Sequence, residues 1–280
     1  EIAKGNFDIK SNVKSRDEVG ALAGAFDQMV DGLQERDKMK NVLNKFHGSS
    51  ITDDILKGDL ELGGSRKRVT VFFSDIRDFT KFSEGHTAEE VVEMLNEYFQ
   101  VMVAIINKNN GVVDKFIGDA IMAVWGAPEP NERDAHNAVK ACVEMREGLA
   151  ELNVLRLERG ETAIKIGMGI HSGDAISGTI GSDERMEYTV IGDTVNQSAR
   201  IEASTKAFGA DLLLSHETMD IVKEEFMIEK AGDVEVKGKS NALRLYKVRG
   251  YIDADGKESP VKTQWSDYES GKADKVKIAP

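Results

Sequence analysis

The sequence has little cysteine, few prolines and no excess of positive charge. Its one cysteine, Cys142, cannot form an intrachain disulfide. No stretch approaches the roughly 18 uninterrupted apolar residues of a membrane span, and no signal peptide opens the chain. The net charge is −12. Because a phosphate backbone demands a positive surface, nucleic-acid binding is not expected.

Residues up to about 46 are predicted to be helical. Apolar residues step by three and four, a spacing typical of a coiled-coil seam, at Val19, Leu22, Phe26, Met29 and Leu33. A strict heptad would then place Arg36 and Lys40 on the seam, so a change of register is expected there. An ordinary amphipathic helix packed on its own domain is the alternative.

From residue 69 the pattern changes to that of an α+β domain. The expected order is a buried strand at 69–76, a helix capped by Thr87, a hairpin turning at Gly118 and Asp119, a helix at 131–159, strands at 164–173 and 174–182, a strand and helix over 185–205, and later strands. This order predicts a ferredoxin-like βαββαβ sheet with added strands and with helices on one face. The polar residues 251–280 are expected to form a mobile tail.

Two aspartates stand out for chemistry. Asp75 follows the first apolar strand, and Asp119 lies in the hairpin turn 44 residues later. Each alone is more often structural, since aspartate is common in turns. If the two strands are neighbours, however, both carboxylates reach one end of the sheet, where a divalent cation would relieve their repulsion.

Three segments in order resemble the motifs of class III nucleotidyl cyclases. They are FFSDIRDFT (72–80), GVVDKFIGDAIMAVWG (111–126) and YTVIGDTVNQSARIE (188–202). The resemblance covers residues 69–248 and implies an adenylate cyclase, which converts ATP to 3′,5′-cyclic AMP and pyrophosphate.

The resemblance also implies residue roles. Two Mg²⁺ or Mn²⁺ ions per site would be held by Asp75, Asp119 and the backbone carbonyl of Ile76. Lys115 and Thr189 would bind adenine, because a lysine donor and a hydroxyl that can accept suit its edge. The resemblance implies that Asn196 orients the ribose and that Arg200 stabilises charge on the α-phosphate. It further implies that Arg185 and Lys237 bind the outer phosphates.

Structural explanations remain open for several of these residues. Asn196 and Arg200 are four residues apart on a helix and could be a solvated pair. Lys115 could simply pair with Asp114 or Glu187. The threonine at position 189 resembles the subgroup that includes bicarbonate-responsive cyclases, so bicarbonate regulation is an open expectation.

The resemblance implies a homodimer with two equivalent sites, each using residues of both chains. Residues 15–33 resemble part of a HAMP module. The expected organisation is therefore the second half of a HAMP helix at 1–36, a signalling helix and transducer at 37–65, the catalytic domain at 66–250 and the tail at 251–280. HAMP modules usually follow a membrane span, so we expect a soluble fragment of a protein held at the cytoplasmic side of the cell membrane by upstream segments.

Other functions stay open at this point. A guanylate or dual-specificity cyclase is one alternative, although the base-reading residues favour ATP. A catalytically inactive, nucleotide-binding signal relay is another, and it predicts a gap in the motif set. A diguanylate cyclase is disfavoured because its Gly-Gly-Asp/Glu-Glu-Phe loop is absent from the sequence.

Overall fold

The computed structural model describes residues 6–11, 13, 15–47, 62–182, 184–235, 242–268 and 277–278. The chain divides into two compact units, residues 1–60 and 61–280, which are described separately. In the described part of the chain, no helix is long and apolar enough to cross a membrane.

The N-terminal unit is built on one helix, α1 (Glu18–His47). The predicted helix is therefore present, but it begins later than predicted, since the described residues before Glu18 are not helical. Asp17 starts it by accepting hydrogen bonds from the backbone N–H groups of Val19 (3.0 Å) and Gly20 (3.2 Å). The preceding segment is tied to the helix by a 2.7 Å hydrogen bond from the Ser11 amide to Asp27. Large apolar side chains of the expected seam are exposed, namely Val19, Leu22 and Met29. Their pairing with a second chain stays a prediction.

The second unit contains one mixed sheet. In chain order its elements are β1 (Gly63–Ile76), α3 (Phe79–Glu84), α4 (Ala88–Lys108), β2 (Val112–Ile117), β3 (Ala120–Trp125), α5 (Asp134–Glu158), β4 (Ile166–Ser182), β5 (Arg185–Ile191), α6 (Asp193–Ser204), β6 (Leu212–Ser215), α7 (His216–Val222), β7 (Phe226–Glu235), β8 (Leu243–Ile252), β9 (Glu258–Pro260) and β10 (Lys277–Ile278). The strand order is β10-β7-β8-β6-β4-β1-β3-β2, with β5 on β4 and β9 on β8. The β4-β1-β3-β2 part with α4 and α5 is the predicted ferredoxin-like core.

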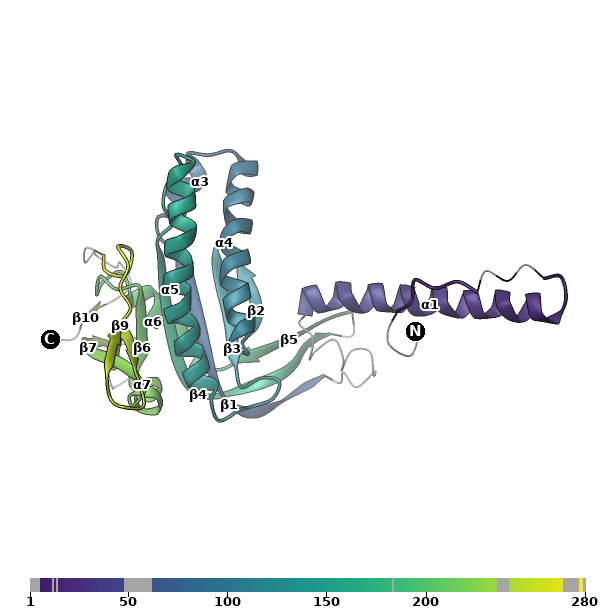
Figure 1. The fold of residues 1–280 in the computed structure, drawn as a ribbon. Coiled ribbons are helices and arrows are strands. Elements are labelled where there is room, and N and C mark those ends of the chain that lie inside the picture. Colours follow the sequence, from purple (N-terminus) through teal and green to yellow (C-terminus); the bar gives the residue numbers. More distant parts are fainter. Residues whose placement is uncertain are drawn as a thin grey trace. The chain divides into compact units, whose positions relative to one another are not determined.

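Helices cover both faces of this sheet. Helices α4 and α5 lie side by side on one face (Figure 1), where Phe72, Tyr98 and Trp125 are fully buried. Helix α6 packs on the other face, where Val195 joins a separate apolar cluster with Val71 and Val124. The Ser198 hydroxyl also donates 2.7 Å to the Val71 carbonyl of β1. The prediction of helices on one face therefore holds for the core helices, and α6 is the exception.

One boundary prediction was wrong. Residues 166–182 form a single strand, β4, rather than two strands meeting at Gly173 and Asp174. Both residues continue in register with β1, opposite Val69 and Arg68. Pairing along the length of β1 keeps this backbone extended where the local sequence suggested a turn.

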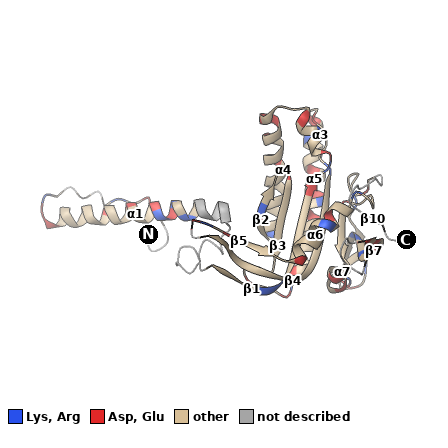
Figure 2. Cartoon of the chain, turned by 180° about the vertical axis from the view of Figure 1, so that it is seen from behind, with Lys and Arg blue, Asp and Glu red and all other residues tan. Residues whose placement is uncertain are grey.

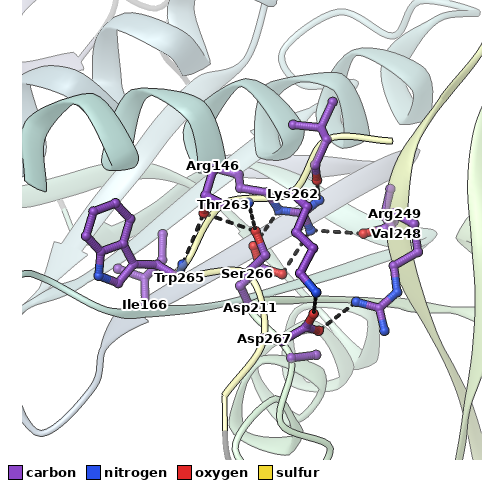
Figure 3. A network of polar contacts seen from close by, with 12 residues as sticks. Arg146, Ile166, Asp211, Val248, Arg249, Lys262, Thr263, Trp265, Ser266 and Asp267 are labelled. Atoms are coloured by element: carbon purple, nitrogen blue, oxygen red, sulfur yellow. Dashed lines mark hydrogen bonds and ion pairs between the residues drawn. The ribbon is translucent and has the colours of Figure 1, made fainter. Parts of the chain in front are cut away.

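The described residues after 250 pack on the domain, and Lys277 and Ile278 pair with β7. Buried Arg146 holds it through a 2.7 Å hydrogen bond to the Val261 carbonyl, while binding Asp211 at 2.6 and 2.9 Å (Figure 3). Trp265 is only 8% exposed. The packing thus continues past the predicted domain boundary at residue 250, because the Val261 carbonyl and the aromatic side chains of Trp265 and Tyr268 hold a segment poor in aliphatic residues.

Candidate active site

Two carboxylates meet at one end of the central strands. Asp75 is the penultimate residue of β1, and Asp119 follows Gly118 in the turn between β2 and β3. Gly118 adopts φ +65°, which favours glycine and allows the tight turn. The Ile76 amide donates a 3.0 Å hydrogen bond to Asp119 Oδ2, which fixes the turn against the end of β1.

This pair is electrostatically strained. Burial raises the pKa of Asp75 to about 7, and hydrogen bonding and charge repulsion with Asp119 act in the same direction. The Arg77 guanidinium opposes the shift in the pKa only weakly. A nearby cation would stabilise the ionised form of both carboxylates.

A third carboxyl group, that of Glu202 on α6, lies close to the pair. Gly167 is the register partner of Asp75 on β4, and a Cβ atom there would fall 2.6 Å from Glu202 Oε1. The Glu202 side chain thus takes the space that a side chain at position 167 would fill. Burial raises the pKa of Glu202 to about 8, together with repulsion from Asp75 and Asp119.

The chemistry of these groups fits a divalent cation. Two carboxylates and a main-chain carbonyl are hard oxygen ligands of the kind that Mg²⁺ and Mn²⁺ accept. Among the described residues there is no group of three or more metal-ligating side chains. A cation at Asp75 and Asp119 would therefore need further oxygen ligands, such as those of a bound polyphosphate.

A second group of polar residues joins β2 to β5. Lys115 Nζ lies 2.9 Å from Glu187 Oε1 and 3.4 Å from Asp114 Oδ1. The Thr189 hydroxyl donates to both oxygens of Asp114, at 3.0 and 2.9 Å. Although burial lowers the pKa of Lys115, the two carboxylates raise it overall, so its ammonium group stays charged. Lys115 and Thr189 are thus brought together through Asp114.

The α6 helix presents the next two candidates to solvent. Asn196 and Arg200 are exposed, and neither side chain has a hydrogen bond or ion pair within the described residues. The opposite side of α6 is anchored by Ser198 and by Thr194, whose hydroxyl donates 2.7 Å to the Asp174 carbonyl. Figure 2 marks basic positions on both α6 and β2.

The remaining phosphate candidates are less defined. Arg185 is exposed at the start of β5, opposite Ser182 of β4. Lys237 lies outside the described residues. In the described part of the chain, no hydrogen bond or ion pair joins the acidic pair to Lys115, Thr189 or the α6 face.

Three further charged residues of this region were not proposed as site residues from the sequence. Glu202 closes the third quoted motif, and Asp114 precedes Lys115, so both lay within recognised segments. Arg77 follows the first metal candidate; it donates 2.7 Å to the Ala210 carbonyl and lies 4.3 Å from the centroid of the Tyr268 ring. The sequence could have indicated these residues, because a charged residue inside an apolar segment is buried only when it has a partner.

Fold and site together are those of a nucleotide cyclase-like domain with an acidic edge formed by Asp75 and Asp119. Residues 64–250 match the family described as "Adenylate and Guanylate cyclase catalytic domain", and residues 1–35 match the HAMP domain. The chain belongs to this adenylate and guanylate cyclase family.

Two curated relatives are named adenylate cyclases. "Adenylate cyclase 1" of Rhizobium meliloti is 36% identical over 68% of this chain and 28% of its own length. "Adenylate cyclase" of Anabaena cylindrica is 34% identical over 89% of this chain and 52% of its own length. The chain thus spans about half or less of these relatives.

Solved structures share the fold. The adenylyl cyclase CyaB from P. aeruginosa is 38% identical with a TM-score of 0.63, covering 67% of this chain and 96% of that one. The guanylyl cyclase Cya2 is 34% identical with a TM-score of 0.66, covering 72% and 100%. The fold alone therefore does not choose between the two bases.

Proposed function

We propose that this chain is an adenylate cyclase that forms 3′,5′-cyclic AMP and pyrophosphate from ATP at sites shared by two copies. The observation that carries the proposal is the acidic edge, where Asp75 and Asp119 are held together at an energetic cost. Such an arrangement is typical of a site that binds cations with a polyphosphate.

Two Mg²⁺ or Mn²⁺ ions would be held by Asp75, Asp119 and the Ile76 carbonyl. When bound, they supply positive charge that activates the ribose 3′-hydroxyl and neutralises the phosphates. Arg200 stabilises the charge that develops on the α-phosphate as pyrophosphate leaves. Asn196 orients the ribose, and Arg185 and Lys237 bind the outer phosphates.

A homodimer is proposed because Asn196 and Arg200 on α6 have no side-chain partner among the residues that the structure describes. Asn196 and Arg200 point into solvent, so a second copy can bring its acidic edge to them. Large apolar side chains are also exposed on strands β2, β4 and β5: Phe116, Ile117, Ile176, Met186 and Ile191. Exposed apolar surface of this kind supports an interface between protein chains.

Adenine is the proposed base because of the residues at the β2–β5 junction. Lys115 supplies a donor for a ring nitrogen, and the Thr189 oxygen can accept from the exocyclic amino group. Guanine carries a carbonyl at that place, so an acceptor facing it would be unfavourable. A guanylate or dual-specificity enzyme is the alternative, and the relative turnover of ATP and GTP decides between them.

The N-terminal unit is proposed to regulate the catalytic domain. A HAMP match at residues 1–35 and exposed apolar residues on α1 support a two-chain helical relay. Membrane attachment through segments outside this chain is part of the same proposal. Inserting two residues after Lys40 rotates the seam and should change turnover several-fold. A seven-residue insertion keeps the heptad phase and is the matched control, so equal turnover in both variants would remove the relay.

The decisive assay is incubation with Mn²⁺ and ATP, followed by chromatographic detection of cyclic AMP and pyrophosphate. The wild-type chain should form both in equal amounts, and Asp75→Ala should form neither. Absence of product from the wild type, or production that survives Asp75→Ala, contradicts the proposal. A nucleotide-binding relay without catalysis would show ATP binding alone.

A further inference from the structure

The Asp114 carboxylate contacts both proposed base-reading residues. It accepts the Thr189 hydroxyl proton at 3.0 and 2.9 Å and lies 3.4 Å from Lys115 Nζ. Its side chain is 5% exposed. Asp114 sits at an irregularity of β2, where the register with β3 shifts between Val113 and Lys115. This bulge aims successive side chains, those of Asp114 and Lys115, at the same junction with β5.

The chemistry of a hydroxyl group gives this contact a consequence. A threonine hydroxyl has one proton to donate and two lone pairs that accept. A buried carboxylate is an acceptor only, so the Thr189 proton is committed to Asp114. The Thr189 oxygen can then offer only lone pairs to a ligand.

Resting on the proposed adenylate cyclase function, we propose that Asp114 is a specificity-determining positioning residue. It fixes Thr189 as a hydrogen-bond acceptor, so that the pair accepts from the adenine amino group and disfavours the guanine carbonyl. A lone threonine could rotate its hydroxyl and serve either base. The discrimination thus belongs to Asp114 and Thr189 together, with Lys115 held beside them by the same carboxylate.

A structural role is the competing explanation. Burial raises the pKa of Asp114, and the Thr189 hydrogen bond and the Lys115 charge oppose that shift. If Asp114 only forms structural hydrogen bonds with its neighbours, replacing it should lower stability and should lower the use of ATP and of GTP by the same factor. The ratio of ATP to GTP utilisation separates the two explanations, because a purely structural defect does not change it.

The test is Asp114→Asn in the full chain, with kcat/KM measured for ATP and for GTP. The asparagine amide can donate to Thr189, which frees the threonine proton to face the base. The ATP/GTP ratio should fall on the order of tenfold, as expected when one hydrogen bond to a charged group is lost. An unchanged ratio in a folded variant overturns the proposal.

Two further variants sharpen the result. Asp114→Asn added to Thr189→Val should leave the ratio at the value of Thr189→Val alone, because Asp114 acts through the hydroxyl. An additional change in the double variant contradicts that route. Glu187→Gln removes the exposed carboxylate on Lys115 without touching Thr189, and its ratio should shift less than that of Asp114→Asn.

Failure of this inference can be told from failure of the proposed function. If the wild type makes no cyclic AMP, or prefers GTP, the adenylate cyclase proposal fails. If the wild type prefers ATP and Asp114→Asn keeps that preference, only the role of Asp114 fails. Affinities for non-cyclisable ATP and GTP analogues, measured with wild type and Asp114→Asn, should show the same fall in ratio.

Discussion

Asp75 and Asp119 lie half-buried at the end of paired strands and are tied together by the Ile76 amide at 3.0 Å. Asn196 and Arg200, by contrast, project from α6 into solvent without a partner within the described residues. Within one chain the two carboxylates of the acidic edge are held close together and repel each other. The Asn196 and Arg200 side chains are also held in place by α6, but they have no hydrogen-bond or ion-pair partner within the described residues. The acidic edge and the α6 side chains are therefore complementary in charge, and a second copy of the chain can supply each group with the partner that it lacks.

The largest expected effect tests that complementarity directly. Asp75→Ala should lower kcat about 10³-fold or more, since metal stabilisation is worth several kcal/mol. Arg200→Ala should lower it roughly 10²-fold. Co-expressing the two variants makes heterodimers in which one site carries both substitutions and the other carries neither. Such a mixture should recover about one quarter of wild-type activity.

A matched pair controls this complementation. Asp75→Ala co-expressed with Asp119→Ala places a defect in both sites, because both substitutions lie on the acidic edge. Cyclic AMP formation should therefore stay low. Recovery in this control, or none with Arg200→Ala, would mean that the two halves do not come from different chains.

A smaller effect should appear in the pH dependence of stability. The pKa of Asp75 is raised to about 7, so the folded state keeps a proton that the unfolded chain loses near pH 4. Its contribution to stability is present below pH 4 and is lost as the pH rises through 7. Asp75→Asn avoids this loss. In the presence of a metal chelator, the melting temperature of Asp75→Asn minus that of the wild type should therefore increase from pH 5 to pH 8.

The gain should be roughly 2–4 °C for each kcal/mol of repulsion relieved. Glu202 shifts in the same direction, with a pKa of about 8, so some pH dependence should persist in the variant. The exposed Glu129→Gln is the control, and its difference from the wild type should stay flat. A flat difference for Asp75→Asn would show that the acidic edge is not strained.

The smallest expected effect concerns how the acidic edge is braced. Arg77 lies over the Tyr268 ring, and the Tyr268 hydroxyl accepts a 3.3 Å hydrogen bond from the Ile166 amide. Tyr268→Leu should cost about 1–2 kcal/mol, which lowers the melting temperature by roughly 2–8 °C. Tyr268→Phe keeps the ring and should lose less. Equal melting temperatures for wild type and Tyr268→Leu would show that residue 268 does not support this edge.

Local patterns in the sequence predicted much of the fold. The capping box at Thr87 and Glu90, the hairpin at Gly118 and the long helix before Gly160 all depend on neighbouring residues, and the structure has each of them. The split of 164–182 was wrong because pairing with β1 decides whether Gly173 turns. Strand β7 (226–235) was not predicted, since its charged residues obscure the alternation of a strand.

The sequence by itself determined most of the helices, the core strands and the family motifs, because these depend on short-range periodicity and on local turn residues. The proximity of Asp75 and Asp119 was expected only on condition that their strands are neighbours, and the pairing of β1 with β3 fulfils that condition. Only the tertiary structure decided that Asp114 meets Thr189 across 75 residues and that Glu202 fills the space beside Gly167. Such contacts are set by strand register and by burial, which bring distant side chains together and shift their charges.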